Sequence, residues 1–200
     1  MNVTARRPYR MVARAKAAEA TGERILDAAV EVFWREPGER DSLDEVARRA
    51  GVSTQTVIRR FGGRDGLFEG AAARALERVR DTRDRAPIGD TEGAVRVLAE
   101  HYEEFGDRAL KILAEEGRLA GKSDVAEIGR DYHREWCMRV FAPALDGLGG
   151  AERRRRLAQI VAVCDVYTWK LLRTDSGLSR RHTELALVEL LEPLTKGFKS

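Results

Sequence analysis

The chain has 200 residues, of which 43% are hydrophobic and 34% are charged. This composition is typical of a globular protein with a core, and it excludes a chain that is disordered throughout. No apolar run approaches the roughly 20 residues that cross a bilayer, and the basic N-terminus lacks the apolar segment of a secretory signal. We therefore expect a cytoplasmic protein with no membrane partner. The two cysteines, Cys137 and Cys164, lie inside apolar helical patterns and are interpreted as core residues in a reducing compartment.

Charge is divided unevenly along the chain. Residues 1–85 hold 18 Lys and Arg against 14 Asp and Glu, whereas residues 86–200 hold 18 against 19. A basic excess at one end fits a nucleic-acid partner, and it also fits an ordinary solvated surface. Charge alone therefore leaves these two interpretations equal.

The first 20 residues are expected to form a basic arm. Five cations precede the first acidic residue, Glu19: Arg6, Arg7, Arg10, Arg14 and Lys16. Such an arm can enter the minor groove or follow phosphates beside a DNA-binding helix, and it can equally be a solubilising tail. Pro8 interrupts the arm, so the sequence favours neither alternative.

Apolar residues recur at three- and four-residue steps along the chain, and no segment alternates with the period of two of a half-buried strand. This pattern predicts an all-α fold. The first helix is expected at about residues 21–36, ended by Pro37 and Gly38. Ser42 and Glu45 have the spacing of a capping box at the head of the second helix.

The stretch SLDEVARRAGVSTQTVIRRFGGRDGLF, residues 42–68, reads as two short helices joined by a glycine turn. Gly51 ends the second helix because glycine adopts the left-handed backbone of a tight stop without strain, and Ser53 caps the third. Helix, short glycine turn and helix together predict a helix-turn-helix.

The third helix is expected to present a polar face without carboxylates. If Val57 points inward, rotation by about 100° per residue places four side chains on the opposite side: Gln55, Thr56, Arg59 and Arg60. Gln can pair with adenine edges and Arg with guanine in the major groove, while further Arg side chains neutralise phosphates. The alternative is a surface helix with a solvated charged face.

Residues 21–68 resemble the DNA-binding domain of the TetR family of bacterial transcriptional regulators. The residues that carry the likeness are Val46-Ala47, Ala50-Gly51-Val52-Ser53, Thr56-Val57, Phe61 and Arg64-Asp65-Gly66-Leu67. One departure is Ile58, which stands where the family usually has a tyrosine that helps to hold a phosphate or base. The resemblance implies base or near-base contacts by Thr54, Gln55, Thr56 and Arg59, and DNA-backbone contacts by Ser42, Arg60 and Arg64.

The resemblance also implies three parts: an arm at 1–20, a three-helix DNA-binding domain at 21–67, and a helical ligand-binding and dimerisation domain at 68–200. Periodicity predicts helices in the last part at about 91–105, 107–119, 123–145, 151–175 and 179–194, giving about nine in total. Their aromatic stripes are either plain core or the effector pocket that the resemblance implies. The pocket candidates are Tyr102, Phe105, Tyr132, His133, Trp136, Cys137, Phe141, Tyr167 and Trp169.

Residues 157–172 are apolar nearly all round and hold a single carboxylate, Asp165, which is expected to be buried. A helix of this kind has to be covered on both sides. The following helix offers a matching stripe of Leu187, Leu190, Leu191 and Leu194. A two-fold pair of these helices predicts a homodimer that spaces two DNA-reading helices roughly 34 to 36 Å apart.

Other chemistry has little support in the sequence. His133 and Cys137 are four residues apart, but no third ligand is spaced for a metal, and His101 is interpreted as a surface residue. No phosphate-binding glycine loop or serine elbow predicts an enzyme. We therefore expect no cofactor and a homodimeric repressor that leaves its operator in double-stranded DNA when a small-molecule effector binds. An activator, a DNA-architectural protein without effector, and a helix-turn-helix fused to a small helical enzyme remain alternatives.

Overall fold

The structure, a computed structural model, describes residues 6–33, 42–114 and 122–196. All regular elements in these ranges are helical, which confirms the all-α prediction. Contacts divide the chain into two compact units, Met1–Glu77 and Arg78–Ser200. Within the described ranges, no helix combines the length and hydrophobicity that a bilayer-spanning segment needs.

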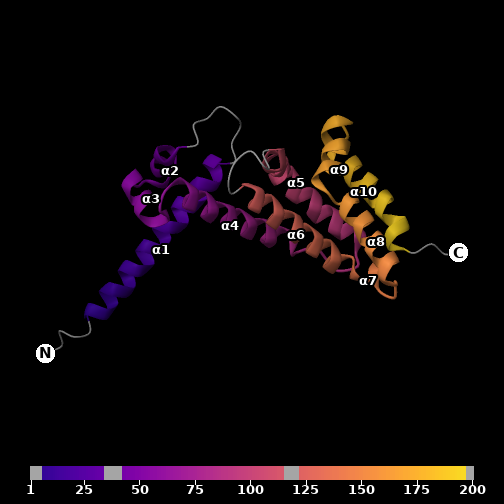
Figure 1. Cartoon of the computed structure of the whole chain (residues 1–200), viewed down its shortest axis with the longest axis horizontal. Helices are drawn as coiled ribbons and strands as arrows, with labels where there is room; N and C mark the ends of the chain where they lie inside the picture. Colours follow the sequence, from indigo (N-terminus) through magenta and orange to yellow (C-terminus); the bar gives the residue numbers. More distant parts are fainter. Residues whose placement is uncertain (1–5, 34–41, 115–121, 197–200) are drawn as a thin grey trace. The chain divides into compact units, whose positions relative to one another are not determined.

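The first unit is a small helical domain built around one long helix. Its elements are α1 (Arg6–Phe33), α2 (Leu43–Ala50), α3 (Thr54–Phe61) and the first part of α4 (Arg64–Arg83). Figure 1 shows α2 and α3 as two short helices beside the C-terminal half of α1, and α2 packs against both α1 and α3. Apolar side chains from all four helices meet in its core, including Ile25, Ala29, Val46, Val57 and Leu67.

The N-caps of α2 and α3 and the glycine turn between them form as local sequence signals predict. The Ser42 hydroxyl accepts a hydrogen bond from the Glu45 backbone N–H at 3.1 Å, and the Ser53 hydroxyl accepts one from the Thr56 N–H at 3.2 Å. Gly51 has φ 66°, in the left-handed region where a side chain is strained. Only half of the predicted capping box forms as expected, because the Glu45 carboxylate binds two arginines of α2 instead of returning to Ser42.

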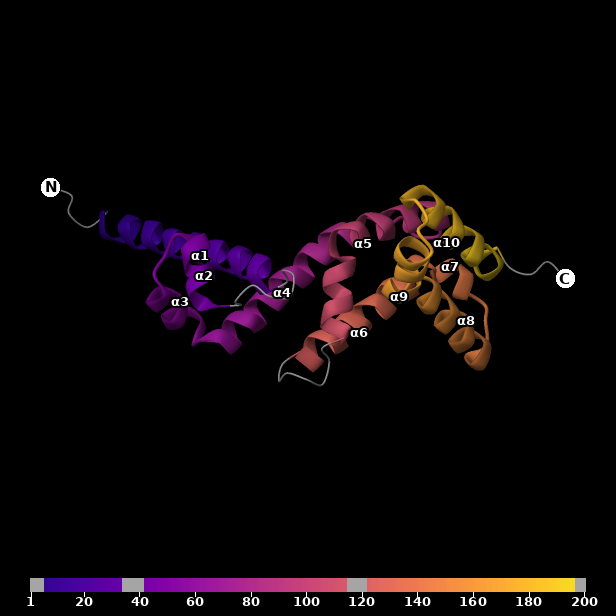
Figure 2. The same ribbon diagram turned by 90° about the horizontal axis from the view of Figure 1, so that it is seen from above.

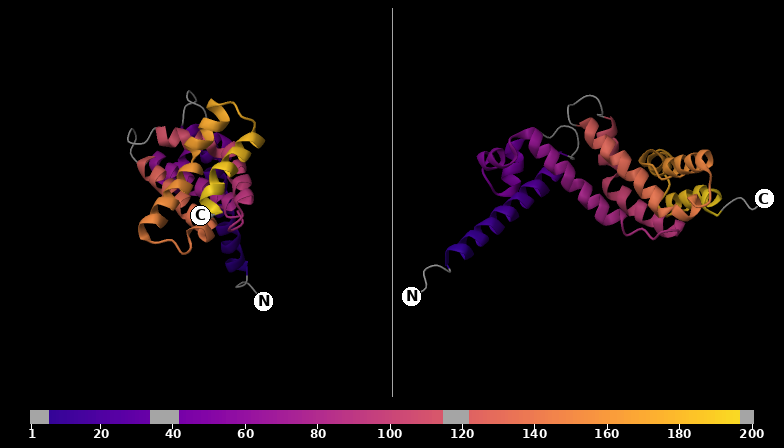
Figure 3. Two further views of the ribbon diagram at one scale, coloured as in Figure 1. Left: turned by 90° about the vertical axis from the view of Figure 1, so that its right-hand side faces the viewer. Right: turned by 60° about the horizontal axis from the view of Figure 1, so that its bottom comes forward.

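The first helix is longer than predicted. It begins at Arg6 and not at about residue 21, so the expected arm is a continuation of α1 (Figure 3). Pro8 lies in the first turn, where its missing N–H has no helical partner to lose, and alanines with high helix propensity follow it. Residues 13–20 are exposed, so their helix has no tertiary support. The predicted stop at Pro37 and Gly38 lies outside the described residues.

The second unit is a bundle of helices. Its elements after the end of α4 are α5 (Thr91–Ala114), α6 (Lys122–Val140), α7 (Ala142–Leu145), α8 (Gly150–Val163), α9 (Val166–Lys170), the π-helical turn η1 (Leu171–Asp175) and α10 (Arg180–Thr195). The helix α5 packs against α6, α9 and α10, and α8 packs against α6 and α10 (Figure 2). Large side chains from these helices are fully buried between them, among them Leu98, Trp136, Leu145, Ile160 and Leu187.

The first predicted helix break in this unit is wrong. The break expected at Gly106 is absent, because α5 continues to Ala114 and buries this glycine against α9. A Cβ at position 106 would lie 3.9 Å from the Trp169 ring and 4.0 Å from Val166. Gly106 is therefore an interior residue of α5 packed beside α9 and does not end a helix. The predicted end of the following helix at 119 lies outside the described residues.

The single helix predicted at 151–175 is divided in two. The helix α8 ends at Val163, and Asp165 is the N-cap of α9, with its carboxylate accepting a hydrogen bond from the Tyr167 N–H at 2.9 Å. Asp165 is thus a partly exposed capping residue, and the prediction of a buried carboxylate is wrong. Similarly, the helix predicted at 123–145 divides into α6 and α7 at Phe141.

The leucine stripe of α10 is only partly available to a second subunit. Leu187 and Leu191 are buried within their own unit, whereas Leu190 is exposed. Leu185, which the predicted stripe does not include, is exposed as well. The outward face of α10 is therefore narrower than the sequence suggests.

Candidate functional site

The helix α3 is held by one apolar side chain and two caps. Val57 is 0% exposed, and Gly62 closes the helix with φ 77°. On the opposite side Gln55 and Arg59 are exposed, and Arg60 is exposed at the edge of α3 next to α1. The exposed amide and guanidinium groups therefore belong to a short helix that is capped at both ends. No residue of α3 is acidic, so the helix itself adds no carboxylate to this face.

Two of the candidate contact residues have hydroxyls that are already engaged. Thr54 donates a hydrogen bond to the Asp44 carboxylate at 2.6 Å, and the Thr56 hydroxyl lies 2.9 Å from the Ser53 hydroxyl. Both threonines are half-buried. Asp44 belongs to α2, so α2 brings a negative charge to the start of α3 that the sequence of α3 alone does not reveal.

Arg60 is positioned by α1. A Cβ on Gly22, a buried glycine of α1, would overlap the Arg60 guanidinium. The guanidinium therefore lies directly on the α1 backbone, although the residue as a whole is exposed. Glycine at position 22 is required for this approach, and the sequence pattern did not single it out.

The remaining DNA-contact candidates are distributed over three elements. Arg64 is the first residue of α4, and its guanidinium carbon lies 5.8 Å from the centre of the Phe33 ring. Ser42 is half-buried, and its hydroxyl caps α2. Arg6, Arg7 and Arg10 lie in the first turns of α1, and their side chains are outside the described part of the structure.

Most of the aromatic pocket candidates in the second unit are buried together. Tyr102, Phe105, Tyr132, Trp136, Phe141 and Trp169 are buried, as are His133 and Cys137. Tyr167 does not join them, since it is 50% exposed. The side chains come from α5, from α6 and its junction with α7, and from α9, and α5 packs against both α6 and α9.

Hydrogen bonds tie this aromatic cluster to neighbouring helices. The Trp136 indole donates to the backbone carbonyl of Arg83 at 2.8 Å, which joins α6 to the end of α4. The Tyr102 hydroxyl donates to the carbonyl of Cys164 at 2.9 Å, which joins α5 to the end of α8. Burial raises the pKa of Tyr102, so the hydroxyl stays protonated and remains a donor.

The sequence missed two members of the cluster. Arg83 and His101 are 3% and 5% exposed, so the interpretation of His101 as a surface residue is wrong. His101 stacks on Phe105 with ring centres 5.5 Å apart. Its position at a buried step of α5, next to Leu98 and Tyr102 on the same face, is the signal that could have identified it.

Comparison with known proteins identifies the first unit. A family model described as bacterial regulatory proteins of the tetR family matches residues 25–71, the segment that contains α2, α3 and the turn between them. Residues 25–71 thus match the DNA-binding domain of TetR-family regulators. The matched segment includes Ala50, Gly51 and Ser53, which form the turn and the α3 cap described above.

Two curated relatives match the same end of the chain. The HTH-type transcriptional regulator AlkX of Mycobacterium tuberculosis is 36% identical over 75 residues, which are 37% of this chain and 36% of that protein. An uncharacterized HTH-type transcriptional regulator, TtgW of Pseudomonas putida, is 46% identical over 55 residues, covering 26% of this chain and 41% of that protein. The chain thus matches well under half the length of each relative.

A solved structure is similar along most of the chain. The crystal structure of a transcriptional regulator from Rhodococcus sp. Rha1 superposes with a TM-score of 0.64 and 22% sequence identity. The match covers 88% of this chain and 96% of that one. At this identity the likeness extends the common fold to the second unit and carries no further information about its ligands.

Proposed function

We propose that this protein is a sequence-specific, DNA-binding transcriptional regulator, and that it acts as a homodimeric repressor released from its operator by a small-molecule effector. The observation that carries the proposal is the exposed face of α3. Gln55, Arg59 and Arg60 project from a helix whose ends are capped and whose other side is anchored by Val57. Such a helix fits the major groove.

Different side chains of this face have different roles. Gln55 and Arg59 are fully free to read base edges, each contributing about 1 to 3 kcal/mol of discrimination. Arg60 and Arg64 bind phosphates, which adds affinity without sequence preference. Thr54 and Thr56 act mainly by supporting α3, because their hydroxyls bind Asp44 and Ser53.

The second copy is proposed to pack on the outer face of α8 and α10. These two helices pack against each other, and α10 leaves Leu185 and Leu190 exposed. On α8 the small side chains of Ala158 and Ala162 are exposed, which permits close approach of a partner helix. Two-fold packing of this helix pair forms a four-helix interface, the arrangement expected of a symmetric dimer.

Effector release is proposed to act through α4. This helix begins in the first unit and ends in the second, where Trp136 binds the Arg83 carbonyl. A molecule that enters the aromatic cluster and shifts Trp136 therefore moves a group bound directly to α4. An effector changes operator affinity only if it binds the DNA-competent and the released arrangements of the protein differently.

A gel-shift titration tests the proposal. The purified chain is titrated against the DNA immediately upstream of its own coding sequence and against a scrambled duplex of equal length, at fixed salt. We expect specific binding at least about a thousandfold tighter than binding to the scrambled duplex. Equal affinity for the two duplexes would contradict the proposal and point to a DNA-architectural protein.

Two further measurements test the dimer and the effector. Sedimentation at micromolar concentration is expected to give a dimer, and Leu190→Glu is expected to give a monomer with weakened operator binding. The matched control is Leu171→Glu, an exposed leucine of η1 outside the α8–α10 face. The gel shift repeated with a metabolite panel is expected to find a compound that releases the specific complex.

A further inference from the structure

Arg83, near the C-terminal end of α4, is a buried cation. Its guanidinium carbon lies 4.2 Å from the centre of the Trp136 ring and 5.7 Å from the centre of the Tyr132 ring. One of its terminal nitrogens donates a hydrogen bond to Nδ1 of His133 at 2.9 Å. Because arginine remains protonated in proteins, a full positive charge lies inside the second unit.

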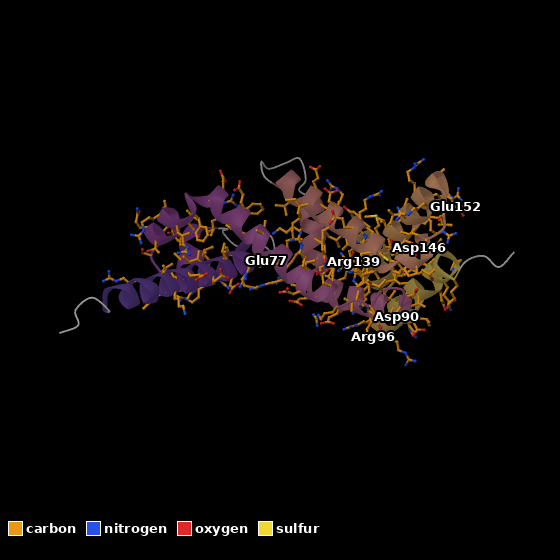
Figure 4. All side chains as sticks on the ribbon, turned by 90° about the horizontal axis from the view of Figure 1, so that it is seen from below. Glu77, Asp90, Arg96, Arg139, Asp146 and Glu152 are labelled. Carbon is orange, nitrogen blue, oxygen red and sulfur yellow. The ribbon has the colours of Figure 1, made fainter. Side chains whose placement is uncertain are left out.

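This charge has no carboxylate partner among the described residues. The Nε atom of Arg83 is buried and has no hydrogen-bond partner within them. The adjacent carboxylate, Asp84, is occupied by the Tyr132 hydroxyl at 3.1 Å and by Arg139, whose side chain is labelled in Figure 4. An uncompensated buried charge is strongly unfavourable, so its presence points to a function.

A second unsatisfied polar atom lies in the same cluster. Nδ1 of His101 is buried without a hydrogen-bond partner among the described residues. Burial, the positive charge of Arg83 and His133 together lower the pKa of His101 to about 3, so its ring is neutral. A neutral imidazole can offer an N–H to an anion without adding a second charge.

The Nε edge of the Arg83 guanidinium is buried and lacks a hydrogen-bond partner among the described residues. Its N–H groups project in the plane of the guanidinium, whereas the ring of Trp136 covers a face. His133 takes one terminal nitrogen, which leaves the Nε side for another acceptor. A carboxylate fits such an edge because its two oxygens accept parallel hydrogen bonds.

We propose that Arg83 is the anchor of a binding site for small organic carboxylates with an apolar body, and that such a carboxylate is the effector. The inference rests on the function proposed above and specifies its ligand class. The carboxylate binds the Nε edge of Arg83, and the apolar body lies among the rings of Tyr102, Phe105 and Trp136. Trp136 binds the Arg83 carbonyl, so a ligand at this position acts directly on the end of α4.

An internal anion is the competing explanation for the buried charge. Although burial raises the pKa of the Cys137 thiol, hydrogen bonds from Cys164 and His133 outweigh burial and lower it. The Cys137 sulfur lies 3.8 Å from Nε2 of His133. A thiolate at this position would compensate Arg83 without any ligand, so the experiment has to distinguish the two anions.

The test compares acids with their uncharged analogues on the full chain. Thermal unfolding is followed at pH 7 with increasing benzoate or phenylacetate, and in parallel with benzamide or phenylacetamide. A ligand that binds only the folded state raises the melting temperature with a concentration dependence that gives its Kd. We expect the carboxylates to bind at least about tenfold more tightly than the amides.

Substitutions of two arginines on α4 provide the matched pair. Arg83→Met retains a long apolar stem without charge and is expected to weaken benzoate binding by at least about tenfold. Arg80→Met is the control, because Arg80 is exposed and also lies beside the Tyr132 ring. We expect it to change the Kd by less than about twofold.

Three outcomes would overturn the inference: no acid of the panel binds, acids and amides bind equally, or Arg83→Met binds benzoate like the wild type. If Arg83→Met does not fold, the comparison of acids and amides on the wild type decides alone. A benzoate response that is absent in the wild type and appears in Cys137→Ser would assign the anion of the wild type to the thiolate and overturn the inference. If the chain binds its operator specifically but binds no acid, the proposed regulatory function is retained and only the proposed carboxylate effector is refuted.

Discussion

The guanidinium of Arg60 in α3 lies on the backbone of Gly22 in α1. A residue of the proposed DNA-reading helix is thus positioned by a glycine 38 places earlier in the chain. The contact links the orientation of a phosphate-binding group to the packing of α1 and makes the role of Gly22 testable.

Gly22→Ala is expected to separate stability from DNA affinity. The added Cβ meets only the flexible end of Arg60, so alanine should raise the free energy of unfolding by roughly 0.5–1 kcal/mol through helix propensity. Displacement of the guanidinium should weaken operator binding by about 1 kcal/mol, roughly fivefold. Urea denaturation and gel shift measure the two effects. Gly129→Ala in α6, where a Cβ meets open space, is the control and should leave DNA affinity unchanged.

Replacing Gln55 and replacing Arg60 are expected to affect DNA binding in different ways. Gln55→Ala should relax sequence preference at one base position by about 1 to 3 kcal/mol and leave the salt dependence intact. Arg60→Ala should weaken binding to all duplexes and reduce the slope of log K against log salt by about 1. Titrations against single-base operator variants at several salt concentrations measure both. An undiminished salt slope for Arg60→Ala would remove this residue from the phosphate contacts.

Asp44→Asn is expected to strengthen DNA binding. The Asp44 carboxylate accepts the Thr54 hydroxyl at 2.6 Å and places a negative charge at the start of α3. Its neutralisation should tighten binding to any duplex by roughly two- to fivefold at low salt, and the gain should fade as salt rises. Thr54→Val, which retains the carboxylate, is the companion variant. An equal gain for Thr54→Val would show that the hydroxyl, and not the charge, is responsible.

Gly66→Ala is expected to destabilise the first unit severely. A Cβ at this position would overlap the backbone carbonyl oxygen of Phe61, which cannot rotate away as a side chain can. We expect a loss of about 2 kcal/mol or more in the free energy of unfolding, measured by urea denaturation. At Gly70 the nearest atom is the flexible side-chain end of Leu26, so Gly70→Ala should cost less. An equal loss in both variants would contradict this explanation.

Stability at low pH is expected to depend on Glu45. Hydrogen bonds from Arg48 and Arg49 lower the pKa of the Glu45 carboxyl from 4.5 to about 2. Because the pKa is lower in the folded state, the stabilisation is fully present above about pH 4.5 and is lost as the pH falls towards 2. Glu45→Gln should therefore flatten the decline of melting temperature in this window. The effect should be small, since the carboxylate is partly exposed to solvent, and it should shrink further in high salt.

The parts of the fold that the sequence predicted correctly depend on local signals. Ser42, Gly51 and Ser53 act on backbone groups within a few residues of themselves, so their spacing was sufficient to locate α2, the turn and α3. The family model covers this same segment. The outward face of α3 was predictable as well, because a single inward residue, Val57, sets the rotation of a short helix.

The surroundings of Gly106 and Arg83 depend on partners distant in sequence, whereas the cap that Asp165 forms is local and was missed. Gly106 has the composition of a helix stop, but the close approach of Trp169 makes it an interior residue of α5. Asp165 has the surroundings of a buried charge, but the chain turns there and uses its carboxylate as a cap. Arg83 looks like one more surface arginine of α4, and only its burial against Trp136 distinguishes it from Arg80.

The helical start of α1 also has a thermodynamic consequence. Residues 13–20 are exposed and bury no apolar face. The helix is therefore stabilised in this segment only by its backbone hydrogen bonds and by the helix propensity of its alanines. The balance between coil and helix shifts with temperature, and it shifts towards helix when a polyanion neutralises the closely spaced cations. On heating, the segment should fray well before the melting of the domain to which it is attached.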